Sequence, residues 1–130
     1  MEVIDFLPGS VNRTEFESRG VVETQYFDKE RKFRKVLEKS RFIFPFSVDE
    51  IVEHERVHVE TARSLGYNAQ YCLSNNGTDY QPGAYINNGN IREIPIDDLI
   101  AILSAPRILG EDDELKLRNL KVFKIFYRDN

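Results

Sequence analysis

The fold is decided by one stretch of sequence, SVDEIVEHERVHVETARSLG, which occupies positions 47–66. It opens with Ser47 and has Glu50 three residues later, the capping-box pattern in which each side chain binds the other residue's backbone amide. No Gly or Pro follows before Gly66, and glycine is the residue that most often ends a helix. The stretch therefore predicts an amphipathic helix over 48–65.

The predicted helix has an apolar face and a polar face. With about 100° between successive residues, the apolar face gathers Val48, Ile51, Val52, Val59, Ala62 and Leu65. The opposite side collects Glu53, Arg56, Glu60, Arg63 and Ser64. Glu55 falls in the middle of the apolar face, with His54 and His58 at its border. A carboxylate in that position is costly to bury unless it is paired, lies near a metal, or opens to a water-filled cleft.

The same helix carries an H-E-x-x-H motif, His54-Glu55-Arg56-Val57-His58, which contains the only two histidines of the chain. Residues four apart on a helix lie one turn above the other, so both imidazoles can reach a single ion at Zn–N distances of about 2.0–2.1 Å. Glu55 lies about 100° round the helix from His54, close enough to contact a water on that ion. The motif therefore predicts a metal site with His54 and His58 as ligands.

These five residues resemble the signature of the zincin superfamily of zinc metallopeptidases, which is H-E-x-x-H on a helix packed beneath an edge strand. The expected order of a strand over 41–46 followed by the helix is similar to that arrangement. The resemblance implies a zinc cofactor held by His54 and His58. It also implies that Glu55 is the catalytic residue, a general base that activates a metal-bound water to hydrolyse a peptide or amide bond. A peptide or protein would then be the substrate.

The resemblance also requires a third metal ligand, and the chain has no third histidine to supply it. A carboxylate is therefore expected. The acidic candidates downstream are Glu93, Asp97, Glu111 and Glu114. Asp97 and Glu93 rank first because they flank a second helix that the sequence predicts over about 95–104.

An alternative without a metal stays open at this point. His54 and His58 would then be ordinary helix residues at the border of the core. Glu55 would pair with Arg56, Arg34 or another cation. The protein would in that case be a small binding protein rather than an enzyme.

The candidate binding surface under this alternative is the basic segment 29–41, which holds seven basic residues and two acidic ones. Its apolar residues have helical spacing, so the simpler interpretation is a helix whose charged side faces solvent. As a binding surface it would hold nucleic acid or an acidic protein. The net charge of −4 for the whole chain disfavours nucleic acid as the partner.

The sequence on either side of the central helix predicts the rest of the fold. Before it, a strand is expected over 21–27 and a helix over about 29–39; after it, a second helix over about 95–104 and a closing strand over 122–127. Between the central helix and the helix over about 95–104, three turn signals indicate tight turns joining short strands. They are Asn75-Asn76-Gly77, Pro82-Gly83 and Asn87-Asn88-Gly89. The expected fold is a single α+β domain over 1–130 with a small mixed or antiparallel sheet.

Composition limits the class of protein. A chain of 130 residues with 41% hydrophobic and 31% charged residues has material for one core, which excludes a wholly disordered protein. The sequence has no run of about 18 apolar residues and no leader-like start, so neither a membrane span nor export is expected. The single cysteine, Cys72, fits a reducing compartment and leaves His, Asp and Glu as the metal ligands. We therefore expect a cytoplasmic protein, in an oligomeric state that the sequence does not define.

Overall fold

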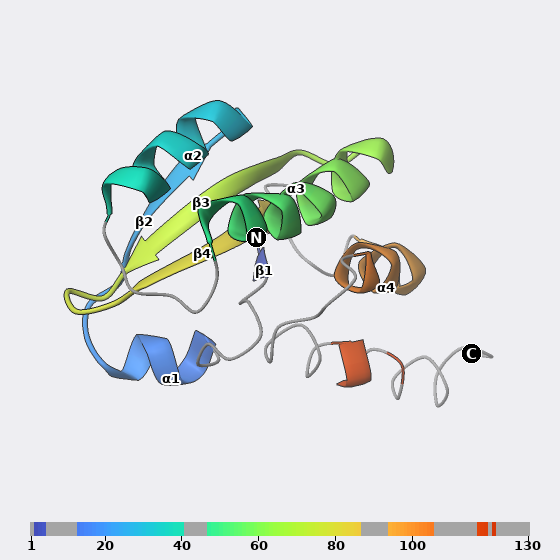
Figure 1. Ribbon diagram of the computed structural model, residues 1–130. Helices are drawn as coiled ribbons and strands as arrows, with labels where there is room; N and C mark the ends of the chain where they lie inside the picture. The colour runs from blue at the N-terminus through green and yellow to red at the C-terminus, as the bar shows by residue number, and fades with distance from the viewer. Residues whose placement is uncertain are drawn as a thin grey trace.

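The computed structural model describes residues 2–4, 13–40, 47–86, 94–105, 117–119 and 121. These residues form strands and helices in the mixture predicted, so the α+β class is confirmed (Figure 1). In chain order the elements are β1 (Glu2–Ile4), α1 (Arg13–Ser18), β2 (Glu23–Phe27), α2 (Glu30–Lys39), α3 (Val48–Ser64), β3 (Ala69–Asn75), β4 (Tyr80–Ile86) and α4 (Ile96–Ser104). Among the described helices, none has both the length and the apolar composition needed to cross a membrane.

The strands form one four-stranded antiparallel sheet with the order β1-β4-β3-β2. Strands β3 and β4 are a hairpin in which Tyr71 pairs with Ala84 and Asn75 pairs with Tyr80. Strand β2 adds to the other side of β3, and β1 adds to the other side of β4. The predicted sheet is therefore antiparallel, and it includes a first strand, β1, that the sequence patterns did not predict.

The hairpin turn is the one predicted at Asn75-Asn76-Gly77. Gly77 has a φ of 94°, a left-handed conformation that glycine adopts without steric cost. The Oδ1 of Asn76 accepts the backbone amides of Thr78 and Asp79 at 3.0 and 2.8 Å. The side chain of Asn76 therefore takes over hydrogen bonds that the turn would otherwise leave unmade.

The turn predicted at Pro82-Gly83 is wrong, because both residues lie in the middle of β4 and pair with Leu73 and Cys72 of β3. Strand β1 pairs only with residues 84–86. Within the described sheet, Pro82 therefore has a strand partner on one side only, which is where sheets tolerate proline. The turn predicted at 87–89 lies outside the described residues, as do the strands predicted over 41–46 and 122–127.

Helix α3 begins and ends as its sequence predicts, within one residue. The capping box is complete, since the Glu50 amide donates to the Ser47 Oγ at 3.2 Å and the Ser47 amide donates to the Glu50 Oε1 at 3.3 Å. At the other end Gly66 has a φ of 95°. Leu65, which was predicted on the apolar face, is 41% exposed because the helix ends at Ser64 and Leu65 is already its C-cap.

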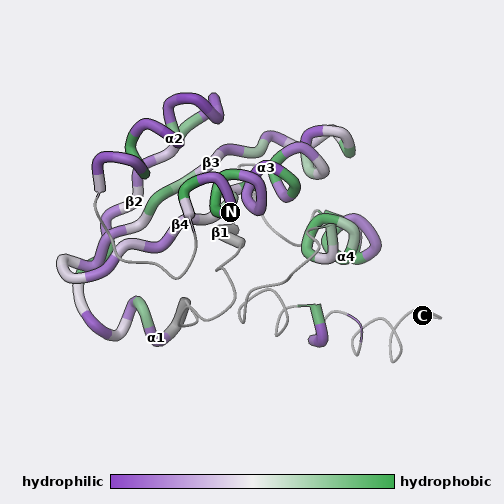
Figure 2. Tube along the Cα trace, viewed as in Figure 1, coloured by the Kyte–Doolittle hydropathy of each residue, from purple (hydrophilic) through white to green (hydrophobic). Residues whose placement is uncertain are grey.

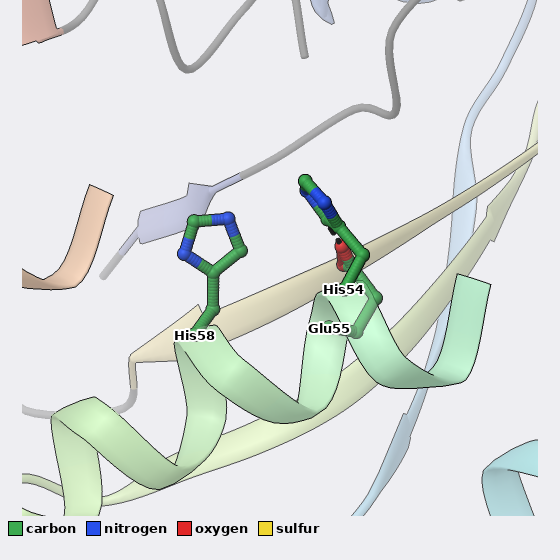
Figure 3. Close-up of side chains that lie close together, drawn as sticks. All are labelled: His54, Glu55 and His58. Atoms are coloured by element: carbon green, nitrogen blue, oxygen red, sulfur yellow. Dashed lines mark ion pairs between the residues drawn. The ribbon is translucent and has the colours of Figure 1, made fainter. Parts of the chain in front are cut away.

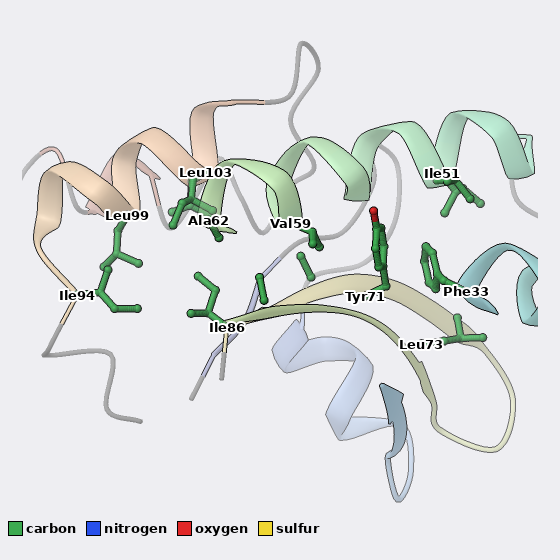
Figure 4. Close-up of a cluster of buried hydrophobic side chains, with 14 of the residues drawn as sticks. Phe33, Ile51, Val59, Ala62, Tyr71, Leu73, Ile86, Ile94, Leu99 and Leu103 are labelled. Atoms are coloured by element: carbon green, nitrogen blue, oxygen red, sulfur yellow. The ribbon is translucent and has the colours of Figure 1, made fainter. Parts of the chain in front are cut away.

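Helices α2 and α3 lie on one face of the sheet, and α4 packs beside α3 (Figure 1). Alternate residues of the hairpin, among them Tyr71, Leu73 and Ile86, share the sheet face that packs against these helices. Figure 4 shows their side chains between the sheet and the buried residues of the helices, which include Phe33, Ile51 and Val59. One core therefore joins α2, α3, α4 and the hairpin, and it holds α3 at the centre.

Helix α2 is largely hydrophilic along its length (Figure 2). Only two of its side chains, Phe33 and Leu37, are buried. Phe33 lies with its ring centroid 5.0 Å from that of Tyr71 and 6.0 Å from that of Phe27. This aromatic cluster attaches α2 to the sheet.

Replacing Phe33 by alanine should lower the free energy of unfolding by about 3–5 kcal/mol, because it removes a fully buried ring from this cluster. Lys32→Ala, at an exposed position of the same helix, should change that free energy by less than about 0.5 kcal/mol. Chemical denaturation followed by circular dichroism measures both variants. A loss below about 1 kcal/mol for Phe33→Ala would show that α2 is not part of the core.

Candidate metal centre

The middle turns of α3 place three potential ligands together: His54, Glu55 and His58, all buried. Each offers one ligand atom, and these atoms lie within 4.8 Å of one another. In the part of the chain that the structure describes, no other group of three or more His, Cys, Asp or Glu side chains could hold a metal ion. Figure 3 shows the three side chains leaving the helix toward the same region.

The two imidazoles converge as their spacing predicts. Their ring centroids are 5.1 Å apart and the ring planes meet at 81°. His54 is 9% exposed and His58 is 0% exposed. A single ion can therefore be reached from both rings, because residues i and i+4 stack on one side of the helix.

The tautomer of His58 is defined by its environment. Its Nδ1 lies 2.8 Å from the backbone carbonyl oxygen of Ile102, in a buried contact. A carbonyl only accepts, so Nδ1 carries the proton and donates it. The lone pair then resides on Nε2, the nitrogen that a metal would bind, and this arrangement is typical of metal-ligating histidines.

Glu55 is the most unusual residue of the group. It is 0% exposed, and neither carboxylate oxygen has a hydrogen-bond partner among the described residues. The Nε2 of His54 lies 3.8 Å from its Oε1, a contact that carries charge only when the imidazole is protonated. Buried polar groups are hydrogen-bonded in most proteins, so this carboxylate requires a further partner.

The two named cations that the metal-free alternative assigns to Glu55 are both engaged elsewhere. Arg56 forms an ion pair with Glu30, and Arg34 forms one with Asp49. Hydrogen bonding to Asp49 raises the pKa of Arg34 above its ordinary value. Pairing of Glu55 with Arg56 or Arg34 is therefore wrong, because acids of α2 and of the first turn of α3 occupy both guanidinium groups.

A carboxyl group in a dry environment must either be protonated or be paired with a cation. A metal ion bound between the two imidazoles would supply that charge. Two imidazole nitrogens and a nearby carboxylate are ligand types that zinc accepts at bond lengths of about 2.0–2.2 Å. The chemistry of the group and its orphaned carboxylate oxygens therefore fit a zinc ion.

Of the carboxylates predicted as the third ligand, Asp97 alone lies among the described residues. Asp97 is exposed in the first turn of α4 and is not a member of the group. Glu93, Glu111 and Glu114 lie outside the described residues. Among the described carboxylates, the one that gathers with the imidazoles is Glu55 itself.

Other side chains that carry chemistry have structural roles. Burial raises the pKa of the Tyr71 phenol to about 12, and its ring stacks on Phe33, so the group stays protonated. Cys72 is a buried free thiol. The contact of His58 with Ile102 was missed, because a backbone carbonyl leaves no signal in the sequence.

The fold and the group on α3 together define a small α+β protein with a candidate metal centre on its central helix. Comparison with protein-family models, curated proteins and solved structures gave no match to the chain. The zincin resemblance therefore rests on the five residues of the motif and on their geometry.

In protein stripped of metal with a chelator, Glu55→Met should raise the free energy of unfolding by about 1–4 kcal/mol, because it removes a buried polar group that lacks a protein partner. Glu53→Met, at an exposed position of the same helix, should change that free energy by less than about 0.5 kcal/mol. Thermal or urea unfolding of the chelator-treated proteins gives both values. Strong destabilisation by Glu55→Met would mean that the carboxylate has a stabilising partner within the protein.

Proposed function

We propose that the protein is a zinc-dependent hydrolase of peptide or amide bonds, with His54 and His58 as metal ligands and Glu55 as the general base. One observation carries the proposal: a fully buried carboxylate without a hydrogen-bond partner in the described chain lies beside two buried imidazoles one helical turn apart. Titratable groups held in such positions cluster at functional sites.

Zinc, when bound, supplies a Lewis acid that makes water nucleophilic at neutral pH. The part of Glu55 is to accept a proton at a carboxylate oxygen as the water oxygen bonds to the carbonyl carbon of the substrate. Glu55 then donates the same proton to the amide nitrogen as the carbon–nitrogen bond breaks. The products are a carboxylic acid and an amine, and Glu55 is ionised again.

The surroundings of Glu55 suit this role. Neither of its oxygens accepts a hydrogen bond from the described residues, so none of these residues competes for the proton-accepting atoms. The nearby Nε2 of His54, 3.8 Å from Oε1, places the carboxylate within one water molecule of the proposed metal ligands. A site from which bulk water is excluded also strengthens every electrostatic interaction inside it.

The third ligand is proposed to come from the segment that precedes or begins α4. Glu93 is the first candidate, because the adjacent Ile94 is only 5% exposed and belongs to the core cluster that includes Val59 of α3. Asp97 is the second candidate, since it lies in the first turn of the helix whose last turn contacts His58. Either would complete the two-histidine, one-carboxylate set common in catalytic zinc sites.

Wild-type protein prepared without a histidine tag should bind about one equivalent of zinc, and His54→Ala or His58→Ala should abolish stoichiometric binding. Glu55→Gln should keep zinc affinity within about tenfold and lower peptide hydrolysis by a factor of about 10²–10⁴, because it removes the base and keeps its shape. Elemental analysis, isothermal titration calorimetry and cleavage of a fluorescent unfolded protein measure these properties. Glu53→Gln, on the exposed side of the helix, is the matched control and should resemble the wild type.

Two results would contradict the proposal. Absence of stoichiometric zinc after dialysis against micromolar zinc would remove the metal centre. Loss of zinc binding in Glu55→Gln would make Glu55 a ligand rather than the base. The protein would then be a metal-binding protein whose group on α3 has no base of its own.

A second candidate function is binding of an anionic partner through α2. The observation in its favour is a set of exposed cations on that helix, while Glu30, one of its two acids, is paired with Arg56. The exposed cations are Arg31, Lys32, Lys35 and Lys39. Arg34 is excluded from this surface because it pairs with Asp49.

If α2 binds nucleic acid, Lys32→Glu with Lys35→Glu should abolish binding, and wild-type affinity should fall steeply between about 50 and 200 mM salt as counterions are released. Gel retardation with single- and double-stranded DNA measures this. Arg118→Glu with Lys121→Glu changes the charge equally at exposed positions elsewhere and should leave binding within about threefold of the wild type. Absence of retardation at about 50 mM salt would rule out this function.

A further inference from the structure

We infer that Tyr67 and Asp98 are positioning residues for the metal-binding nitrogen of His58, acting through α4. The inference rests on the proposed metal centre and adds to it a closed ring of contacts that links α3 and α4. The ring runs from His58 to Ile102, along α4 to Asp98, across to Tyr67, and back along α3.

The first link is the hydrogen bond from His58 Nδ1 to the Ile102 carbonyl, at 2.8 Å. Ile102 belongs to the last turn of α4, where carbonyl groups lack the amide partner that a continuing helix would give. The amide of Ala105 approaches this oxygen only at 3.4 Å. The carbonyl is thus available to the imidazole, and the partial negative charge of the helix C-terminus favours an N–H donor there.

The second link lies one turn earlier on α4. The phenol of Tyr67 donates to the Oδ2 of Asp98 at 2.5 Å. This hydrogen bond raises the pKa of Tyr67 above its ordinary value, so the phenol stays protonated as a donor. Asp98 and Ile102 are four residues apart, so the two contacts lie about one helical turn apart along α4.

The third link fixes Tyr67 to the end of α3. The Gly66 amide donates to the Arg63 carbonyl and the Tyr67 amide donates to the Ala62 carbonyl, each at 3.0 Å. With Gly66 at a φ of 95°, this pair of bonds is a Schellman motif, which sets the direction of the chain as it leaves the helix. Ala62 lies one turn beyond His58, so the ring closes on the helix where it started.

Apolar packing alone would not position α4 to the same degree. Leu99 and Leu103 are buried in the cluster that contains Ala62 (Figure 4), and Ile102 belongs to the same cluster. Apolar contacts of this kind have no preferred direction. The two hydrogen bonds, one near each end of α4, define its rotation and its position along α3. Loss of the Tyr67–Asp98 bond should therefore loosen the Ile102 carbonyl from His58 and allow the tautomer with hydrogen on Nε2, in which Nε2 has no lone pair to give to a metal.

The test measures the tautomer of His58 in metal-free protein by ¹⁵N NMR, at a pH about two units above the ordinary histidine pKa of about 6.5. Wild-type protein should show hydrogen on Nδ1. Tyr67→Phe and Asp98→Ala should each raise the fraction with hydrogen on Nε2 and weaken zinc binding by about 10–100-fold. Asp98→Asn keeps an oxygen that accepts from Tyr67 and should restore the wild-type tautomer.

Tyr26→Phe is the control, because it removes the hydroxyl of a tyrosine that is 46% exposed. Tyr26 is distant in the sequence from the residues that form the ring of contacts. This substitution should leave both the tautomer and the zinc affinity unchanged. A wild-type His58 with hydrogen on Nε2 would overturn the inference. So would a wild-type tautomer and zinc affinity in folded Tyr67→Phe and Asp98→Ala.

The two proposals fail separately, because the tautomer is measured without zinc. If the tautomer changes as expected and the protein binds no zinc, the proposed hydrolase function is wrong and the ring of contacts is supported. If the protein binds zinc equally well with and without the Tyr67 hydroxyl, and the tautomer of His58 is unchanged, the positioning role of the ring of contacts is wrong. The proposed hydrolase function is then unaffected.

Discussion

Glu55 lies on the apolar face of α3, fully buried, where no described side chain donates a hydrogen bond to its carboxylate. An ionised group without compensation there opposes folding, whereas the residues around it, such as Ile51, Val52 and Val59, favour it. The core thus gains stability from its apolar members and accommodates one group that works against them. Natural proteins keep such groups mainly where they serve a function, which makes this conflict the strongest indication of a site in the molecule.

The way α2 meets α3 keeps that conflict in place. Arg56 and Arg34, the two arginines named in the metal-free alternative as partners of Glu55, are paired with Glu30 and Asp49. Ion pairs that are partly exposed contribute only about 0–1 kcal/mol each, so their importance lies less in stability than in which acid each cation contacts. These two ion pairs leave the Glu55 carboxylate beside the imidazoles of His54 and His58 and away from both guanidinium groups.

Much of the central helix and of its candidate metal centre could be predicted from the sequence, because both depend on residues close together in the chain. The bounds of α3, the burial of Glu55 and the convergence of His54 and His58 all follow from helical periodicity and capping. The false turn at Pro82-Gly83 and the missed strand β1 have one cause: both depend on pairing with β4, which local composition does not report. The partner of His58 could not be predicted for a different reason, since every residue has a carbonyl and only the packing of α4 selects that of Ile102.

The pairing of β1 with β4 has a consequence for the order of folding. Glu2 pairs with Ile86, so this edge of the sheet forms only after a long loop has closed. Strands β3 and β4, in contrast, follow α3 in the chain and are joined to each other by a tight turn. Loop closure costs entropy before long-range contacts compensate for it, and local contacts form sooner. We therefore expect α3 and the hairpin to assemble first and β1 to join late. The three side chains of the metal centre all belong to that early unit, so their gathering does not depend on the late pairing of β1.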